Sequence, residues 1–165
     1  MMGISIKQFE RSHWEAVSEI YALGMATGHA TFETAVPDLD AWLKKFRADL
    51  LWVAIVDGVV AGWAGLQPVS VREVYRGVVE VTIYVHPGHA GKGVSTALMR
   101  HLVEQSEAAG IWTLYASIFP ENTASIRLHE AACFREIGYR ERIAQMHGKW
   151  RNTVLYERRS KIVGN

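Results

Sequence analysis

The sequence predicts an α/β protein in which helices cover both faces of a mixed β-sheet. Two apolar segments flank the dipeptide Asp57-Gly58, which is typical of a tight turn between antiparallel strands. The β-branched segment 78–85 leads through a glycine-rich turn into an amphipathic segment, as a strand leads into a helix. Strand-like and helix-like segments alternate along the rest of the chain, which favours a sheet between two layers of helices.

The first fifty residues are expected to form one strand and two helices. Residues 4–9 carry the apolar positions of a short strand. Ser12 and Glu15 have the spacing of a capping box, which would open a helix that ends near Gly24. A second helix is expected over 37–50, because a proline precedes apolar residues that recur at helical spacing.

The middle of the chain is expected to be mostly sheet. Residues 52–56 and 59–66 predict the two strands of a hairpin, and residues 78–85 predict a further strand. The glycine-rich turn at 88–93 then leads into a helix over 94–110.

The last third of the chain completes the sheet. A strand is expected over 112–119, a helix over 122–132, and two final strands, one through Gln145 and one over 154–157. The expected order is therefore β, α, α, three β, α, β, α, β, β. This order corresponds to a three-layer α/β/α arrangement.

Composition limits the possible classes of function. The 165 residues are 49% hydrophobic and 21% charged, which suits one folded domain over residues 1–165. With 18 Lys and Arg against 17 Asp and Glu, the formal charge of +1 argues against nucleic acid as a partner. Cys133 is the only cysteine, and glycines interrupt the most apolar segment, 50–66. We therefore expect a cytoplasmic protein with neither a targeting nor a membrane-spanning segment.

Two segments open helices directly after strands. Gly91-Lys92-Gly93 forms a glycine turn before one helix, and Asn122-Thr123-Ala124-Ser125 opens the next. In such a turn, backbone N–H groups converge on an anion such as a pyrophosphate, and the helix N-terminus adds partial positive charge. Taken alone, the glycine turn is equally typical of an ordinary connection.

With these two segments the sequence resembles the GNAT superfamily of N-acetyltransferases. The first segment matches the superfamily's pyrophosphate motif, Gln/Arg-x-x-Gly-x-Gly/Ala, at Gly93, whereas Ala90 and Ser95 differ from its outer positions. The resemblance implies a GNAT-type, mostly antiparallel sheet and acetyl-CoA as cosubstrate, with no metal. The implied coenzyme-binding residues are Ile83, Tyr84, Val85, Ala90, Gly91, Lys92, Gly93, Val94, Ser95, Thr96, Asn122 and Ser125.

Within the superfamily, the sequence is most similar to the phosphinothricin acetyltransferase-like branch, which acetylates small amino acids. The resemblance extends over nearly the whole chain, although Cys133-Phe134 replaces the usual Gly-Phe. This branch implies a homodimer, in which the hairpin His147–Lys149 can come from the partner subunit. The supporting stretches are 30–34, 75–80, 122–130 and 147–150.

Glu80 is the candidate general base. In a strand it would share a face with Thr82 and Tyr84, so a solvent-facing position is one explanation. A carboxylate on a sheet face covered by a helix must instead be paired or have a function. The resemblance places the superfamily's general base here. An ammonium ion must lose a proton before the amine attacks a thioester, and backbone N–H groups near Tyr84 and Val85 would stabilise the oxyanion.

His129 lies seven residues after Asn122, where the superfamily has a tyrosine that protonates the leaving thiolate. An imidazole can donate a proton near neutral pH. A hydrogen-bonded helix histidine explains the residue equally well. Asn122 and Ser125 are expected to contact the pantetheine amides, and both also suit the start of a helix.

Candidates for substrate binding lie before the strand that holds Glu80 and in three other segments. Arg72 and Arg76 have the guanidinium groups that hold a carboxylate or a phosphinate, although exposed arginines are commonly only solvated. The full set, most of it implied by the resemblance, is Phe32, Glu33, Arg72, Tyr75, Arg76, Trp112, Thr113, His147 and Lys149.

The sequence thus predicts an acetyl-CoA-dependent N-acetyltransferase for the α-amino group of a small amino acid. Phosphinothricin, methionine sulfoximine and methionine sulfone are the expected kinds of acceptor, with detoxification or herbicide resistance as the biological role. Two alternatives stay open. One is an acetyltransferase for another amine, such as a peptide N-terminus, a polyamine or an aminoglycoside. The other is a non-catalytic acyl-CoA-binding module, against which the retention of Glu80 argues.

Overall fold

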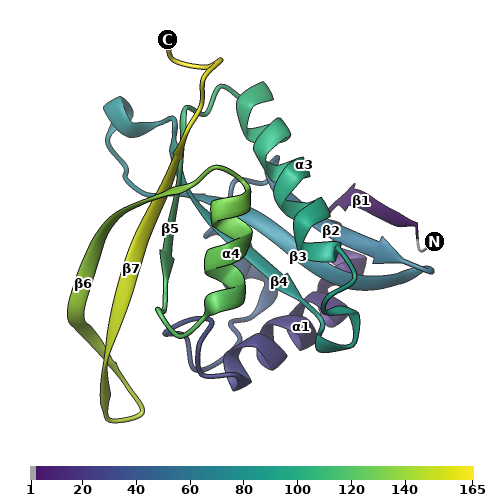
Figure 1. The fold of residues 1–165 in the computed structure, drawn as a ribbon. Helices are drawn as coiled ribbons and strands as arrows, with labels where there is room; N and C mark the ends of the chain where they lie inside the picture. Colours follow the sequence, from purple (N-terminus) through teal and green to yellow (C-terminus); the bar gives the residue numbers. More distant parts are fainter. Residues whose placement is uncertain (1–2) are drawn as a thin grey trace.

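The computed structural model describes residues 3–165 and contains one twisted, open sheet (Figure 1). Within these residues the sheet has seven strands in the order β1-β2-β3-β4-β5-β7-β6. All neighbouring pairs are antiparallel except β4 and β5, which confirms a mixed, mostly antiparallel sheet. The strands are β1 (Ile4–Gln8), β2 (Leu51–Val56), β3 (Val59–Pro68), β4 (Val78–Val85), β5 (Thr113–Ile118), β6 (Arg135–Met146) and β7 (Lys149–Arg159).

Helices cover both faces of this sheet, as expected (Figure 1). The α-helices are α1 (Trp14–Ala26), α2 (Leu39–Leu43), α3 (Val94–Ala108) and α4 (Thr123–Ala131). Short 3-10 turns occur at Arg11–His13 (η1), Glu73–Tyr75 (η2) and Pro87–His89 (η3). No helix of the described residues is both long enough and apolar enough to span a membrane.

The pleat of β4 separates two apolar cores. Val79, Val81 and Ile83 face α3 and α4, where they pack with residues of the larger core. Tyr84 faces the opposite side, where its ring stacks on Trp63 with the centroids 5.2 Å apart. The alternation predicted from the sequence is therefore present, and Glu80 is on the α1 face.

The N-terminal helices differ from the predictions in two details. The predicted capping box at Ser12 is wrong, because Ser12 lies inside η1 and Glu10 N donates to His13 Nδ1 at 3.0 Å instead. The second helix does begin where expected, since Asp38 caps it by accepting from Ala41 N. It ends at Leu43 and not near residue 50. Residues 47–50 turn to form backbone hydrogen bonds with β3, and this tertiary pairing overrides the helical spacing of the sequence.

The single parallel pair, β4 and β5, is joined over only part of its length. The pairs are Val78–Thr113, Val79–Leu114 and Glu80–Tyr115, and the two strands separate beyond Glu80. We call the paired part the closed end and the separated part the open end. Since β5 continues to Ile118 and β4 to Val85, the gap lies inside the sheet.

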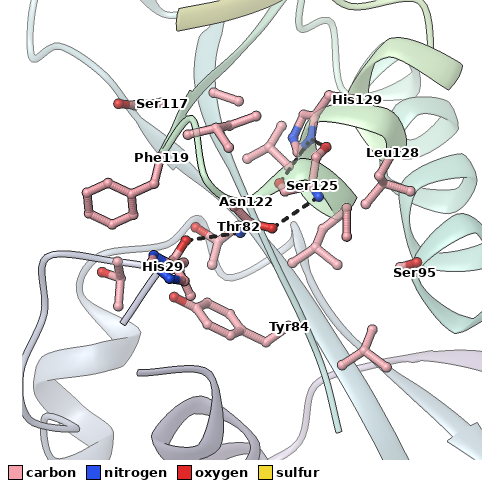
Figure 2. Close-up of a pocket in the computed structure, with 18 of the residues that line it drawn as sticks. His29, Thr82, Tyr84, Ser95, Ser117, Phe119, Asn122, Ser125, Leu128 and His129 are labelled. Carbon is pink, nitrogen blue, oxygen red and sulfur yellow. Dashed lines mark hydrogen bonds between the residues drawn. The ribbon is translucent and has the colours of Figure 1, made fainter. Parts of the chain in front are cut away.

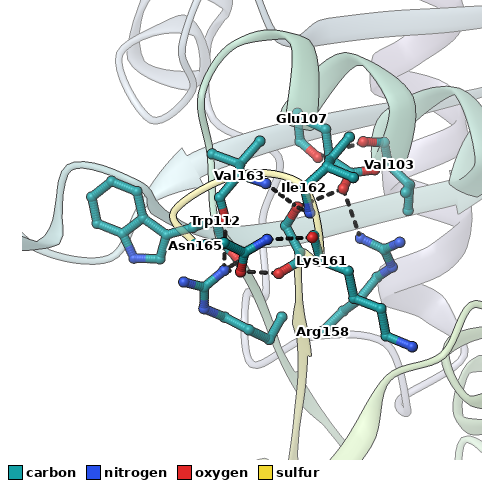
Figure 3. A network of polar contacts seen from close by, with 11 residues as sticks. Val103, Glu107, Trp112, Arg158, Lys161, Ile162, Val163 and Asn165 are labelled. Atoms are coloured by element: carbon teal, nitrogen blue, oxygen red, sulfur yellow. Dashed lines mark hydrogen bonds and ion pairs between the residues drawn. The ribbon is translucent and has the colours of Figure 1, made fainter.

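The closed end is tied to the C-terminal residues by a polar network (Figure 3). Arg159 Nη1 donates to Val163 O at 2.8 Å, and its Nη2 donates to Gly164 O at 2.7 Å. Ser160 Oγ donates to a carboxylate oxygen of Glu107 on α3 at 2.6 Å. These bonds fasten the end of β7 to α3, so the polar groups at this end of the sheet are largely satisfied.

Candidate active site

A cavity of about 1090 Å³ passes through the gap between β4 and β5. Its lining comes from both faces of the sheet, and we divide it into two lobes. The α3-side lobe comprises Val81, Ile83, Val85, Ala90, Gly91, Val94, Ser95, Ala124, Ser125, Leu128 and His129. The α1-side lobe comprises Tyr21, His29, Thr31, Phe32, Glu33, Lys45, Gln67, Glu80, Thr82, Tyr84, Ser117, Phe119, Glu121 and Thr153. Figure 2 shows labelled residues of both lobes around one opening.

The glycine turn before α3 has the geometry of an anion site. Gly91 and Gly93 have φ of 74° and 85°, a region that side chains disfavour. The first backbone bond of the helix is from Ala97 N to Gly93 O. Within the described chain, the N–H groups of residues 91–96 have no backbone acceptor and therefore remain available. Together with the helix dipole they fit a pyrophosphate.

Not every residue of this motif lines the cavity. Ala90, Gly91, Val94 and Ser95 line the α3-side lobe. Thr96 instead lines a neighbouring groove between α3 and α4, which Ser95 also borders. Since Ala90 contributes only a methyl group, an anion here would be held by backbone donors.

Glu80 lies at the point where β4 and β5 separate. Its carboxylate accepts a hydrogen bond of 2.7 Å from Gln67 Nε2, which projects from the neighbouring strand β3. Burial raises the pKa of the Glu80 carboxyl above its ordinary value, and the bond from Gln67 offsets this in part. A carboxylate with a raised pKa, open to a cavity, accepts a proton more readily than an ordinary carboxylate does.

In β4, alternate residues form backbone hydrogen bonds with β3, and the residues between them direct their N–H groups into the gap. His86 N donates to Ala61 O at 2.8 Å, so every second residue before His86 pairs with β3 by hydrogen bonds. Tyr84 belongs to this set, and its N–H is therefore directed to β3. Ile83 and Val85 direct their N–H groups into the gap, so they, and not Tyr84, supply the open donors.

His129 is buried between the two predicted coenzyme segments. Its Nδ1 lies 2.7 Å from Ser125 O, a carbonyl that can only accept, so Nδ1 carries the proton (Figure 2). Its Nε2 is buried without a partner among the described residues. Burial lowers the pKa of His129, and the bond to Ser125 opposes this shift. The imidazole is therefore neutral near pH 7, with a lone pair at Nε2.

Asn122 joins α4 to the loop that follows α1. Its Oδ1 accepts from Ser125 N at 3.2 Å, which caps the helix, and its Nδ2 donates to His29 O at 3.1 Å (Figure 2). Residues 29–37 make no backbone–backbone hydrogen bond within the described chain. This loop is therefore held in place by side chains.

Arg151 of β7 is the main anchor of that loop. Its Nη1 donates to Gly28 O at 2.8 Å, and its Nη2 lies 3.0 Å from His29 Nδ1 and 3.4 Å from Glu121 Oε2. The guanidinium also lies over the Phe119 ring, 4.1 Å from its centroid. The side chain is only 13% exposed, so these contacts fix the entrance of the α1-side lobe.

Several residues predicted to bind substrate do not reach the cavity of the single chain. Tyr75 ends η2, and Arg72 and Arg76 flank this short exposed turn at the closed end. The Arg76 guanidinium lies 5.4 Å from the Trp112 ring centroid, which is a contact at the surface. Four more predicted residues are also absent from the lining, because they lie at the closed end or at the β6–β7 turn; these are Trp112, Thr113, His147 and Lys149.

The α1-side lobe also contains residues that sequence reasoning missed. Gln67 was detectable, since it is a polar residue in an apolar strand and pairs directly with Glu80. Tyr21, Lys45 and Thr153 carry no such signal in the sequence. Their place in the cavity depends on how α1, the α2 region and β7 pack onto the sheet.

The fold and the cavity are those of an acyl-transfer enzyme, in which a sheet opens next to a helix N-terminus. The sequence pattern of the acetyltransferase (GNAT) family matches residues 14–133. The chain therefore belongs to the acetyltransferase (GNAT) family, which confirms the expected enzyme class.

Individual relatives agree with this assignment. Phosphinothricin N-acetyltransferase of Streptomyces viridochromogenes is 31% identical over 94% of this chain and 87% of its own length. L-methionine sulfoximine/L-methionine sulfone acetyltransferase of Salmonella typhimurium is 28% identical over 89% of both chains. The crystal structure of a phosphinothricin acetyltransferase from Sinorhizobium meliloti in complex with acetyl-CoA superposes with a TM-score of 0.89 at 28% identity, covering 98% and 90% of the two chains. The expected phosphinothricin acetyltransferase-like branch is thereby confirmed.

Proposed function

We propose that this protein transfers the acetyl group of acetyl-CoA to the α-amino group of a small amino acid or a toxic analogue. Phosphinothricin, methionine sulfoximine and methionine sulfone are the candidate acceptors. The observation that carries the proposal is the Glu80 carboxylate, which has a raised pKa and opens into the α1-side lobe where the strands separate. The names of the relatives support the same reaction class.

Acetyl-CoA supplies an acetyl group activated as a thioester. The backbone donors of residues 91–96 and the N-terminus of α3 would hold its pyrophosphate. The acceptor amine would enter the α1-side lobe, where Glu80 removes its proton directly or through a water molecule. The neutral amine then attacks the acetyl carbonyl directly.

The open backbone donors of β4 suit the charge that develops in this step. Negative charge appears on the carbonyl oxygen during the attack, and the N–H groups of Ile83 and Val85 point into the gap. Fixed donors of this kind stabilise an oxyanion without reorganisation. Asn122 is engaged as a helix cap, so its contact with pantetheine would use its remaining hydrogen-bonding capacity.

The proposed role of His129 as general acid meets an energetic obstacle. A general acid needs a proton to release, whereas neutral His129 presents only a lone pair at Nε2. Its lowered pKa opposes the required protonation. These observations favour the explanation that His129 is a hydrogen-bonded helix histidine and not a general acid.

The experiment that tests the proposal is free-thiol release from acetyl-CoA by the purified protein. The acceptors are phosphinothricin, methionine sulfoximine, methionine sulfone, spermidine and a peptide amine. Turnover confined to the amino-acid analogues supports the proposal, whereas turnover only with spermidine or the peptide favours the alternative acetyltransferases. If acetyl-CoA raises the Tm but none of these amines is acetylated, the coenzyme site stands and the substrate assignment falls.

We further propose that the protein is a homodimer that works in the cytoplasm. The edge strand β6 exposes Ile137, Tyr139 and Ile143, and Trp150 of β7 is 58% exposed beside it. A second copy of this chain would cover these apolar side chains and bring His147 and Lys149 toward its partner's site. Light scattering should give a dimer mass that Tyr139→Glu lowers to that of a monomer, and an unchanged monomer mass in the parent would contradict the proposal.

A further inference from the structure

Gln67 and Glu80 form a cross-strand pair on the α1 face of the sheet. They lie directly opposite each other in the antiparallel register of β3 and β4. Side chains at such positions on one face of a sheet are in contact. Gln67 Nε2 donates to Glu80 Oε2 at 2.7 Å, and both side chains are half-buried. The pair belongs to two adjacent strands of one chain, so it forms without any contribution from a partner subunit.

The backbone that holds Gln67 is fixed from both edges of β3. On one edge β3 pairs with β4 throughout this part of the sheet. On the other edge Leu66 N donates to Leu50 O at 3.0 Å. Phe46 packs on Gly65, which lies two residues before Gln67 on the same face, since a Cβ at Gly65 would lie 2.7 Å from the Phe46 ring. The Gln67 amide therefore projects from a rigid position.

The hydrogen bond gives the two oxygens of the Glu80 carboxylate different surroundings. An ionised carboxylate can only accept, so the Gln67 amide turns its N–H side toward Glu80. Oε2 is thereby occupied, and the carboxylate is restrained from rotating. Oε1 is the oxygen left to receive a proton from the cavity, which both side chains line.

The same bond opposes the effect of burial on the charge of Glu80. Burial raises the pKa of the Glu80 carboxyl, whereas the bond from Gln67 lowers it, because a donated N–H stabilises the ionised form. A general base must be ionised before it can take a proton. Gln67 therefore keeps a half-buried carboxylate available as a base.

We propose that Gln67 is the positioning residue of the general base, whose amide holds Oε2 of Glu80 and leaves Oε1 to take the proton of the acceptor amine. This inference rests on the proposed acetyltransferase function and deepens it. Other titratable groups line the same cavity, and a second copy in the proposed homodimer would add its His147 and Lys149. The lining groups are Tyr21, His29, Glu33, Lys45, Tyr84, His89, Glu121 and His129. All of them are present in the parent protein and in a Gln67 variant, so a difference between the two proteins reports the amide.

The pH dependence of kcat tests this role. Gln67→Met keeps the length of the side chain and removes the donor. With acetyl-CoA and methionine sulfone both saturating, the pH below which kcat falls should rise by about one unit, as for the loss of one hydrogen bond to a charged group. Gln67→Glu replaces the donor with a second carboxyl, whose like charge should raise this pH further. As a matched control, Gln8→Met removes the bond from Gln8 Nε2 to Ala48 O, outside the cavity, and should leave the profile unchanged.

A direct titration tests the pair without turnover. Carbon-13 NMR of the ligand-free protein follows the Glu80 carboxyl signal, which is assigned by its loss in Glu80→Gln. The pKa of this carboxyl should be about one pH unit higher in Gln67→Met than in the parent protein. An unchanged pKa in this titration, or an unchanged pH profile of kcat, would overturn the inference. A higher pKa together with no transfer to any tested amine would uphold the pairing and refute the proposed function instead.

Discussion

The two ends of the β4–β5 pair differ in how their polar groups are satisfied. At the closed end the strands pair, and the network around Arg159 and Ser160 leaves few groups without partners (Figure 3). At the open end, the N–H groups of Ile83 and Val85 face a gap, and His129 Nε2 is buried with no partner among residues 3–165. Unsatisfied groups are unfavourable in a folded protein unless a ligand completes them. The contrast supports the proposal that the open end holds the catalytic groups, whereas the closed end contributes to stability.

The substitution with the largest expected effect is Glu80→Gln at the open end. It should lower kcat by about 10²–10⁴-fold, because the proton acceptor is lost, while acetyl-CoA binding persists. Stability should change in the opposite direction. Burial raises the folded-state pKa of the Glu80 carboxyl, so the parent protein loses stability as pH rises through that pKa. The variant should therefore have a higher Tm than the parent at pH 7, whereas the two Tm values should be equal below pH 4. Free-thiol release measures the loss of kcat, and thermal unfolding measures the change in Tm. A Tm far below that of the parent protein at pH 7 would contradict the assignment of the open end to catalysis.

Gly77→Ala tests the closed end. A Cβ at Gly77 would lie 2.1 Å from a ring carbon of Trp112, so the alanine should destabilise the fold by about 1–3 kcal/mol. The kcat/KM per folded molecule should stay the same. Urea unfolding gives the stability change, and Gly138→Ala, where the nearest atom is 3.8 Å away, is the control. A specific loss of activity without a loss of stability would contradict the division of roles.

Arg151→Gln is expected to loosen the loop at the entrance of the α1-side lobe. The acceptor KM should rise about tenfold as charge-assisted hydrogen bonds are lost, while the KM for acetyl-CoA stays unchanged. Arg135→Gln, which breaks a 2.7 Å ion pair with Glu157 on the same sheet, should change neither KM. Equal rises in both KM values for Arg151→Gln would contradict the assignment of Arg151 to the α1-side lobe alone.

His129 should make stability depend on pH in the acid range. A histidine whose folded-state pKa is lowered contributes stability that is present above about pH 6.5 and is lost as pH falls through the folded pKa. In His129→Gln, the free energy of unfolding, measured by urea unfolding at a series of pH values, should no longer show this fall at acid pH. If the same variant also abolishes turnover at pH 7 while coenzyme binding persists, the general-acid role would regain support.

The smallest effect is expected at Cys133, which follows α4. Cys133 has φ of 68°, and Phe134 N donates to His129 O at 3.0 Å across it, as in a helix end that favours glycine. Cys133→Gly should therefore raise the free energy of unfolding by about 1 kcal/mol without a change in turnover. Cys133→Ala, which keeps the unfavourable φ, should bring no gain in urea unfolding.

Local patterns predicted most of the fold and the α3-side lobe. The strand 78–85, the glycine turn and the helix after Asn122 are properties of short contiguous segments, and each occurs as expected. Glu80 was identifiable because an acid interrupts an apolar strand. The helix expected to continue to Leu50 was wrong, because its backbone bonds with β3 are long-range.

Most residues of the α1-side lobe could not be predicted from the sequence. Arg72 and Arg76 precede Glu80 in the chain, but the strand carries them to the closed end, away from the cavity. Arg151 and Lys45 reach the site from distant segments, through the packing of β7 and of the α2 region. Proximity in sequence to Glu80 therefore did not indicate which residues line the cavity of the single chain, and the role of Arg72 and Arg76 in substrate binding stays a prediction.

The passage of the cavity through the sheet has a kinetic consequence. Because the lobes are lined by residues from opposite faces of the sheet, the coenzyme and the acceptor can be bound together, and neither has to leave before the other arrives. Initial rates measured at several fixed levels of one reactant should therefore give intersecting double-reciprocal lines. The acetylated amine would occupy the α1-side lobe, so an accumulated product should compete with its parent amine and not with acetyl-CoA.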